Sequence, residues 1–226
     1  MSLSILHNAI DDWLLDNQRP FFNLKTDIMV IGAQEALSRR KPDLEAVTLV
    51  LAELSHRSNK AASNAKSHVQ DRLEEINHQP IQWLFEARNS LKLLSFEEKP
   101  NENYTASTYV ILRDGYSNQN GRYGIYVGQT TKSLEQRFNE HLTGNNAGRG
   151  MQNHGLHLMR SLMWPWQKVP GSKRLFFESA LHRALELGNK RVPKVTGDFV
   201  PIDEWPEDFQ LKLRQHISNQ NGLMID

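Results

Sequence analysis

Residues 108–142 read TYVILRDGYSNQNGRYGIYVGQTTKSLEQRFNEHL, and this stretch decides the fold of the second half of the chain. It contains two short runs of β-branched and aromatic residues, at 108–112 and 123–127, separated by a polar segment rich in Gly, Asn and Ser. Runs of this kind favour strands, and a separating segment of this composition favours a turn. The pattern therefore predicts an antiparallel hairpin with a long polar turn.

A helix is expected directly after the hairpin. Ser133 and Gln136 have the spacing of a capping box, so the helix should begin near residue 134. Its apolar face, which is expected to pack onto the sheet, consists of Leu134, Phe138 and Leu142. Arg137 and His141 are four residues apart and should lie one turn apart on another face. This would place a cationic pair beside the hairpin.

The remainder of the second half is expected to be a long loop followed by helices. Residues 143–155 are rich in Gly and Asn, too polar to pack in a core and long enough to touch a ligand. The spacing of apolar residues predicts helices over 156–163 and 176–187, and a final helix near 209–217.

The first half of the chain, residues 1–99, reads as mostly helical. Apolar residues recur at helical spacing near the N-terminus and along 43–76, which predicts a long helix that ends before Pro80. A further amphipathic run covers 83–94, and a linker rich in Glu, Asn, Lys and Pro spans about 97–104.

These patterns predict an α/β (α+β) fold, in which a small antiparallel sheet is flanked by helices and follows a mostly helical N-terminal region. The expected division of the chain is 1–99, 105–195 and 196–226. A chain of this length is able to bury a substantial core.

The composition limits the chemistry that is available. The 226 residues include no cysteine, which excludes disulfides, thiolate catalysis and cysteine zinc sites. The N-terminus lacks the basic start and apolar run of a signal peptide, and no run approaches 18 apolar residues. A cytoplasmic protein without a membrane partner is the expectation.

The formal charge of +1 hides an uneven distribution. Between Arg113 and Lys194 there are 13 Lys and Arg against 5 Asp and Glu, a local balance of +8 that leaves −7 for the remainder. A concentrated positive charge favours a polyanion such as nucleic acid, although a solvated basic face has the same composition. The basic residues between 57 and 66 leave the same two alternatives, phosphate or solvent.

Two tyrosine-containing triplets carry a resemblance to a known family. Residues 126–128, Tyr-Val-Gly, follow 108–110, Thr-Tyr-Val, on the two expected strands. With the residues that come after them, they make about 105–195 resemble the GIY-YIG endonucleases, small α/β modules that cut DNA with a divalent metal. The literal Gly-Ile-Tyr at 124–126 is not the first half-motif, because no second tyrosine strand follows it. The first half-motif is then 108–110, which lacks the family's glycine and isoleucine.

The resemblance implies a set of site residues on the elements that follow. Arg137 comes about ten residues after the second tyrosine, and His141 is one helical turn further on. Glu178 matches the family's helix-borne glutamate and Asn189 its asparagine, while Glu186 is a rival of Glu178 on the same expected helix. Arg137 would hold the scissile phosphate, and Glu178 would bind a divalent metal, Mg²⁺ or alternatively Mn²⁺.

The roles of the two tyrosines remain open at this level. Tyr109 would take a proton from water with help from nearby cations, since a phenol with a pKa of about 10 is a weak base at neutral pH. His141 titrates closer to neutrality and would assist. The alternative is that Tyr126 activates the water while Tyr109 binds phosphate. Contacts with DNA are also expected from three basic residues, Lys132, Arg149 and Arg160.

The resulting hypothesis is a metal-dependent DNA endonuclease of the restriction type. Residues 1–99 would recognise the DNA target or a partner, and the substrate would be double-stranded. Cutting both strands with one site per chain would favour a homodimer. The alternatives are a phage or mobile-element nicking nuclease, and a catalytically inactive nucleic-acid-binding protein on the same scaffold.

Overall fold

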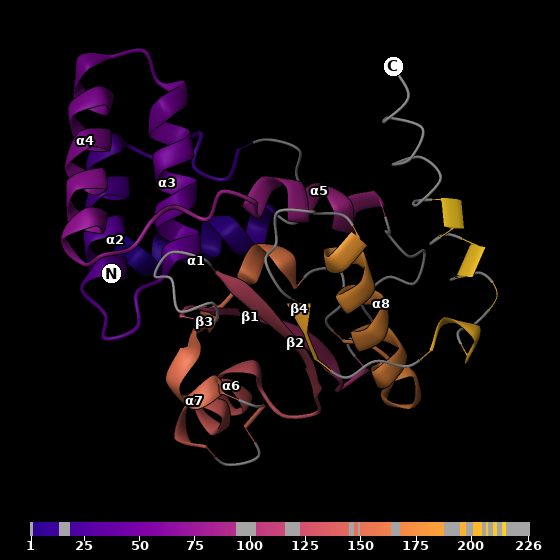
Figure 1. The fold of residues 1–226 in the computed structure, drawn as a ribbon. Coiled ribbons are helices and arrows are strands. Elements are labelled where there is room, and N and C mark those ends of the chain that lie inside the picture. Colours follow the sequence, from indigo (N-terminus) through magenta and orange to yellow (C-terminus); the bar gives the residue numbers. More distant parts are fainter. Residues whose placement is uncertain are drawn as a thin grey trace.

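The structure of the chain is a computed structural model. The residues that it describes are 2–13, 19–93, 103–115, 123–144, 147–148, 150–163, 168–187, 195–197, 201–204, 207, 210–211 and 214–215. In Figure 1, α2, α3 and α4 gather at one end of the molecule, α8 lies at the other, and a small sheet runs between them.

The N-terminal region is helical, as predicted. Its helices are α1 (Ser2–Trp13), α2 (Thr26–Leu37), α3 (Leu44–His56), α4 (Lys60–Glu75) and α5 (Leu84–Leu93). The long helix expected over 43–76 is instead two helices, because Asn59 caps a new one by accepting a hydrogen bond from the Ala62 N–H at 2.8 Å. Arg57 fills the corner between them and donates to the main-chain oxygens of Phe21 and Leu24.

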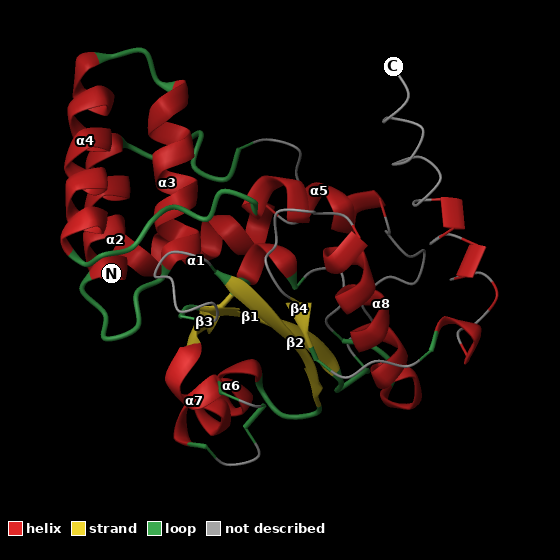
Figure 2. Ribbon diagram, in the orientation of Figure 1, coloured by secondary structure: helices red, strands yellow, loops and turns green. Residues whose placement is uncertain are grey.

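Within the described residues, four strands form one sheet in the order β3-β1-β2-β4. They are β1 (Ser107–Arg113), β2 (Gly124–Thr130), β3 (Gly155–Leu158) and β4 (Val195–Thr196). The predicted hairpin is confirmed, because β1 and β2 pair as antiparallel strands. β3 is also antiparallel to β1, whereas β4 runs parallel to β2. Figure 2 shows this sheet with helices around it, the mixed α/β architecture that the sequence predicts.

The prediction of a helix over 156–163 is wrong. This segment forms β3 and then a 3-10 helix, η1 (Arg160–Leu162). Leu158 pairs with Ile111, and the Met159 N–H donates to the Val110 oxygen at 2.8 Å. The segment therefore forms a strand because it hydrogen-bonds to the edge of β1. Pairing with a distant strand overrides the local apolar spacing, which short helices and strands share.

The loop expected over 143–155 is only partly a loop, since it contains the short helix α7 (Met151–His154). The helix before it, α6 (Leu134–Thr143), begins where the capping box predicts: Ser133 Oγ accepts from the Gln136 N–H at 3.2 Å. The apolar face of α6 is less buried than expected. Leu134 and Phe138 are half-buried against the core, whereas His141 is the buried residue of this helix.

The C-terminal part of the described chain centres on α8 (Arg174–Leu187), which packs against β1 and β2. Two short 3-10 helices, η2 (Gly171–Lys173) and η3 (Ile202–Glu204), precede and follow it. Most of the helix expected near 209–217 lies outside the described residues. No helix in the described part of the chain is both long enough and apolar enough to cross a bilayer.

The N-terminal helices and the sheet segment are joined by buried polar contacts. The Glu45 carboxylate accepts hydrogen bonds from the N–H groups of Arg160 and Ser161 at 2.7 and 3.0 Å, and so caps η1. His157 Nε2 accepts from the Leu44 N–H at 3.0 Å. These contacts place the start of α3 directly against the end of β3.

Candidate active site

The two tyrosines project from the same face of the hairpin. Tyr109 is paired with Gly128, and Ile111 is paired with Tyr126, so the two rings are diagonal neighbours across β1 and β2. Their ring centroids are 6.2 Å apart. Tyr109 is 1% exposed, whereas Tyr126 is half-buried. The residue opposite Tyr109 is a glycine, which leaves the space that its ring occupies.

His141 completes an aromatic cluster with these tyrosines. It projects from α6 and is fully buried, with its ring centroid 5.6 Å from that of Tyr109 and 5.2 Å from that of Tyr126. Nδ1 of His141 accepts a hydrogen bond from the Gly148 N–H at 3.1 Å. In a neutral imidazole the proton must then be on Nε2, which lies 2.6 Å from the Tyr109 hydroxyl oxygen and donates to it.

His141 is not half of a cationic pair, which corrects the expectation from the sequence. Burial lowers the pKa of His141 to about 4, and the positive charge of Arg137 contributes to the decrease. The imidazole is therefore neutral at pH 7. It acts on Tyr109 as an N–H donor rather than as a cation.

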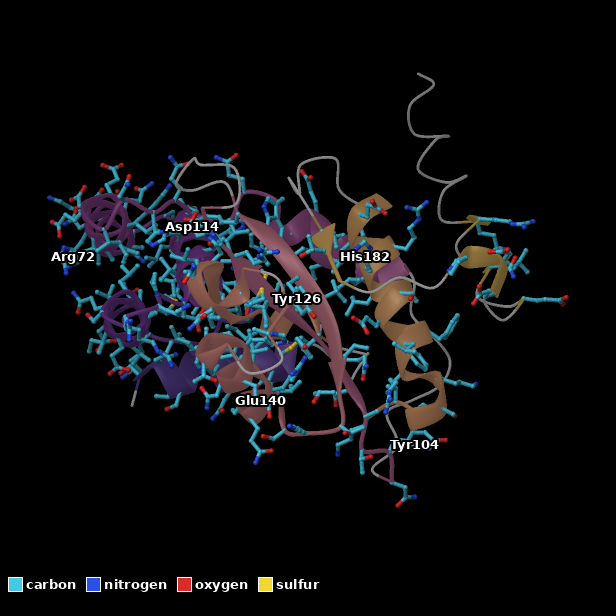
Figure 3. The ribbon with its side chains drawn as sticks, turned by 60° about the horizontal axis from the view of Figure 1, so that its bottom comes forward. Arg72, Tyr104, Asp114, Tyr126, Glu140 and His182 are labelled. Atoms are coloured by element: carbon cyan, nitrogen blue, oxygen red, sulfur yellow. The ribbon has the colours of Figure 1, made fainter. Side chains whose placement is uncertain are left out.

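Arg137 also donates to Tyr109. Its Nε lies 3.1 Å from the hydroxyl oxygen, and its Nη1 forms an ion pair with Glu140 Oε2 at 3.1 Å. Nη2 of Arg137 donates to no residue in the described part of the chain, and the side chain is 19% exposed. Figure 3 labels Glu140 on α6 and Tyr126 on β2, the two elements that meet at the cluster. One guanidinium nitrogen thus remains available for an anion.

The hydroxyl oxygen of Tyr109 receives two donors, from Arg137 and His141. Burial raises the pKa of Tyr109 well above its ordinary value and Tyr126 adds to the rise, whereas Arg137 opposes it. The phenol is therefore protonated at neutral pH, but both donors would stabilise the phenolate once it formed.

Two glycines make room for the tyrosine rings. A Cβ atom on Gly128 would lie 2.4 Å from the hydroxyl oxygen of Tyr109, and one on Gly148 would lie 2.6 Å from Cε2 of Tyr126. Gly148 also orients His141 through its N–H. The sequence reasoning did not identify Gly148, and its only signal was the glycine-rich loop. Glu140 was also missed, although its i,i+3 spacing from Arg137 would have indicated an ion pair.

Glu178 and Glu186 lie in different surroundings on α8. Glu178 is 2% exposed on this helix, which packs against β1 and β2, and its charge adds to the raised pKa of Tyr109. Glu186 instead forms an exposed ion pair with Arg183. No group of three or more His, Asp or Glu side chains suited to a metal occurs among the described residues. A single hard carboxylate still fits Mg²⁺, which usually takes one or two carboxylates and completes its shell with water and substrate phosphate.

The other predicted residues do not all lie at the cluster. Lys132 is close to it, since its Nζ forms an ion pair with Glu140. Arg160 lies at the junction with the N-terminal helices, where its Nη1 is 2.8 Å from Asp11 Oδ2. Arg149 and Asn189 lie outside the described residues.

Comparison with known proteins identifies one segment of the chain. No curated protein and no solved structure matches the chain. A family model matches part of it, and Glu178 and Asn189 lie outside the matched residues. Residues 105–173, which hold the hairpin, α6, α7 and β3, match the family model described as the GIY-YIG catalytic domain, and this segment therefore has a nuclease fold that implies a nucleic-acid substrate.

Proposed function

We propose that this protein is a metal-dependent endonuclease that hydrolyses phosphodiester bonds in double-stranded DNA. The observation that carries the proposal is the pair of hydrogen bonds that Arg137 and His141 donate to one buried phenol oxygen, that of Tyr109, within a GIY-YIG catalytic segment.

Arg137 is the proposed phosphate-binding residue. Its Nε and Nη1 are held by Tyr109 and Glu140, which fixes the plane of the guanidinium. Nη2 then donates to a non-bridging oxygen of the scissile phosphate, where negative charge grows in the transition state. The cation is permanent, so this contact does not depend on pH near neutrality.

Tyr109 is the proposed base. Tyr109 first loses its hydroxyl proton to solvent. The phenolate then takes a proton from the attacking water while the water oxygen bonds to phosphorus and the bond to the 3′ oxygen breaks. Burial disfavours the phenolate, and the donors from Arg137 and His141 offset that cost. Tyr126, which is half-buried beside it, is then placed to contact the phosphate.

Glu178 is the proposed ligand of the divalent metal, Mg²⁺ or alternatively Mn²⁺. An ion bound there would provide Lewis acidity, which neutralises charge on the leaving oxygen. Glu178 supplies the hard oxygen ligand, and its burial keeps bulk water from competing for that oxygen. Asn189 stays a proposed catalytic residue and is not proposed as a metal ligand.

The N-terminal helical region, residues 1–99, is proposed to recognise the target, with 105–195 as the catalytic unit and 196–226 as an extension. The contacts of Glu45 with η1 support a helical region held in a constant position relative to the site. The proposed role is of the restriction type, and one active site per chain would favour a homodimer that cuts both strands.

One assay tests the function and the metal ligand together. Supercoiled plasmid is incubated with the purified protein and Mg²⁺ or Mn²⁺, beside Arg137→Ala, Glu178→Ala and the control Glu186→Ala. We expect the wild type and the control to cut, and the two site variants to be inactive. Cutting that persists in both site variants would refute the site. No cutting with either metal would favour the binding protein, and sequencing of the ends would separate restriction-type cutting from random nicking.

A further inference from the structure

A groove of about 900 Å³ lies between the N-terminal helices and the catalytic segment. One wall is the turn between α2 and α3, which carries Arg39, Arg40 and Lys41. The other wall is formed by α6, α7 and β3. We call this the basic groove. It is built from both halves of the chain, so the GIY-YIG segment alone does not form it.

Arg39 and Arg40 bring uncompensated charge to the groove. Both are exposed, and neither forms an ion pair with another residue in the described part of the chain. The acidic groups on the groove are Asp43 and Glu135, and Asp43 already lies 2.7 Å from His7 Nε2. An exposed arginine pair without acidic partners is suited to a polyanion.

Lys41 holds this basic turn in place. Its Nζ donates to the main-chain oxygens of Gln152, at 3.3 Å, and of Gly155. Partial burial lowers the pKa of Lys41, and the two main-chain oxygens already occupy donors of its ammonium group. Because Lys41 is tied to α7 and β3, the two arginines before it are positioned relative to the catalytic segment.

The groove also offers neutral donors of the kind that contact phosphates. Asn139 of α6 and Gln152 and Asn153 of α7 line it with side-chain amides. α6 separates the groove from Arg137 and His141, since Asn139 and Leu142 project from a different face of that helix. The two flanks of α6 are about one helix diameter, ~10 Å, apart. The major groove of B-DNA is about 12 Å wide, so its two backbones have a similar separation.

We propose that the basic groove binds the phosphodiester backbone of one strand of the DNA duplex, while the opposite strand lies at Arg137. The inference rests on the proposed function and adds the element that seats the duplex. Arg39 and Arg40 contact phosphates, and the amides of α6 and α7 add hydrogen bonds. The N-terminal region thereby contributes to DNA binding through this turn.

Binding is measured by fluorescence anisotropy with a labelled duplex, in EDTA so that no cutting occurs, at several salt concentrations. The variant is Arg39→Gln with Arg40→Gln, whose exposed side chains leave the fold intact, as a thermal melt would verify. The matched control is Lys60→Gln with Lys66→Gln on α4, which removes the same charge from the stretch where sequence alone also allowed phosphate binding.

We expect the arginine variant to weaken binding about 10- to 100-fold near 0.1 M salt and to reduce the slope of log K against log[salt] by about 2. The lysine control should match the wild type. Three outcomes would overturn the proposal that the groove binds DNA. They are an arginine variant that binds like the wild type, a larger loss of affinity in the lysine control, and a wild type that binds no duplex. Arginine-dependent binding without cutting by any metal would leave the groove intact and refute only the nuclease.

Discussion

The hydroxyl oxygen of Tyr109 lies 2.6 Å from Nε2 of His141, although the two residues are 32 positions apart in the chain. The Gly148 N–H holds the other imidazole nitrogen as an acceptor, so the hydrogen bond runs from histidine to tyrosine. His141 therefore supports a phenolate and does not remove the phenol's proton.

The two tyrosines are expected to have different roles in cutting. Tyr109→Phe keeps the ring but removes the hydroxyl, and kcat for plasmid cutting should fall by about 10²- to 10⁴-fold. Tyr126→Phe should act mainly on KM. The control is Tyr123→Phe, whose hydroxyl bonds Gln79 away from the cluster and whose loss should affect only stability. A loss of kcat in Tyr126→Phe alone would assign water activation to Tyr126.

Arg137→Lys should cost about 10²- to 10³-fold in kcat despite keeping the charge. An ammonium group cannot hold Tyr109, Glu140 and a phosphate oxygen through one planar group. The control, Arg183→Lys, changes an arginine of α8 that pairs with Glu186. Equal activity of the Arg137 variant and the wild type would exclude the planar contact.

Gly128→Ala should displace the Tyr109 phenol, because the new Cβ would lie 2.4 Å from its oxygen. We expect a loss of about 1–3 kcal/mol in the free energy of unfolding, together with a loss of cutting. Gly171→Ala is the control, since a Cβ there meets nothing within 4 Å. Denaturant melts of both variants give the comparison, and equal stability would contradict the close packing at Gly128.

His141 should stay neutral across the physiological range, because its pKa is lowered to about 4. The pH profile of cutting should then show no inflection near pH 6.5 from this residue. The direct measurement is an NMR titration of the His141 ring proton, compared with the same spectra of His141→Gln for assignment. A midpoint near 6.5 would show that the ring is solvated and would restore the cationic pair.

The free energy of unfolding should carry a pH-dependent contribution from Glu45. Burial and the neighbouring Asp43 raise the pKa of Glu45 from its ordinary 4.5 to about 7. The folded state then binds more protons between these values, so the contribution is full below pH 4.5 and is lost as the pH rises through 7. His141 has the opposite sign, since its contribution is lost as the pH falls from 6.5 through 4.

Glu45→Gln isolates the first contribution. The free energy of unfolding of the wild type minus that of the variant should fall by about 3 kcal/mol between pH 4.5 and 7. Denaturant unfolding at a series of pH values measures this difference. A difference that does not change with pH would show that the hydrogen bonds from Arg160 and Ser161 keep Glu45 charged in the folded state.

Local signals in the sequence were sufficient for several elements. The β1–β2 hairpin and α6 follow from a β-prone pattern and a capping box within a few residues, and α3 begins close to the predicted helix start at residue 43. The order of Tyr109, Tyr126, Arg137 and His141 identified a GIY-YIG segment, which the family match confirms for 105–173. These features depend on neighbours in the chain, so a single sequence contains them.

Other features depend on partners that the chain brings from far away. Residues 156–163 form β3 and η1 because they hydrogen-bond to the edge of β1 and to the carboxylate of Glu45. The local sequence of this segment does not predict these distant partners. His141 is neutral because the fold buries its ring and lowers its pKa. The sequence alone determined which chemical groups are present and in what order. The tertiary structure decided their charge and their partners, because burial and long-range hydrogen bonds, rather than spacing, control both.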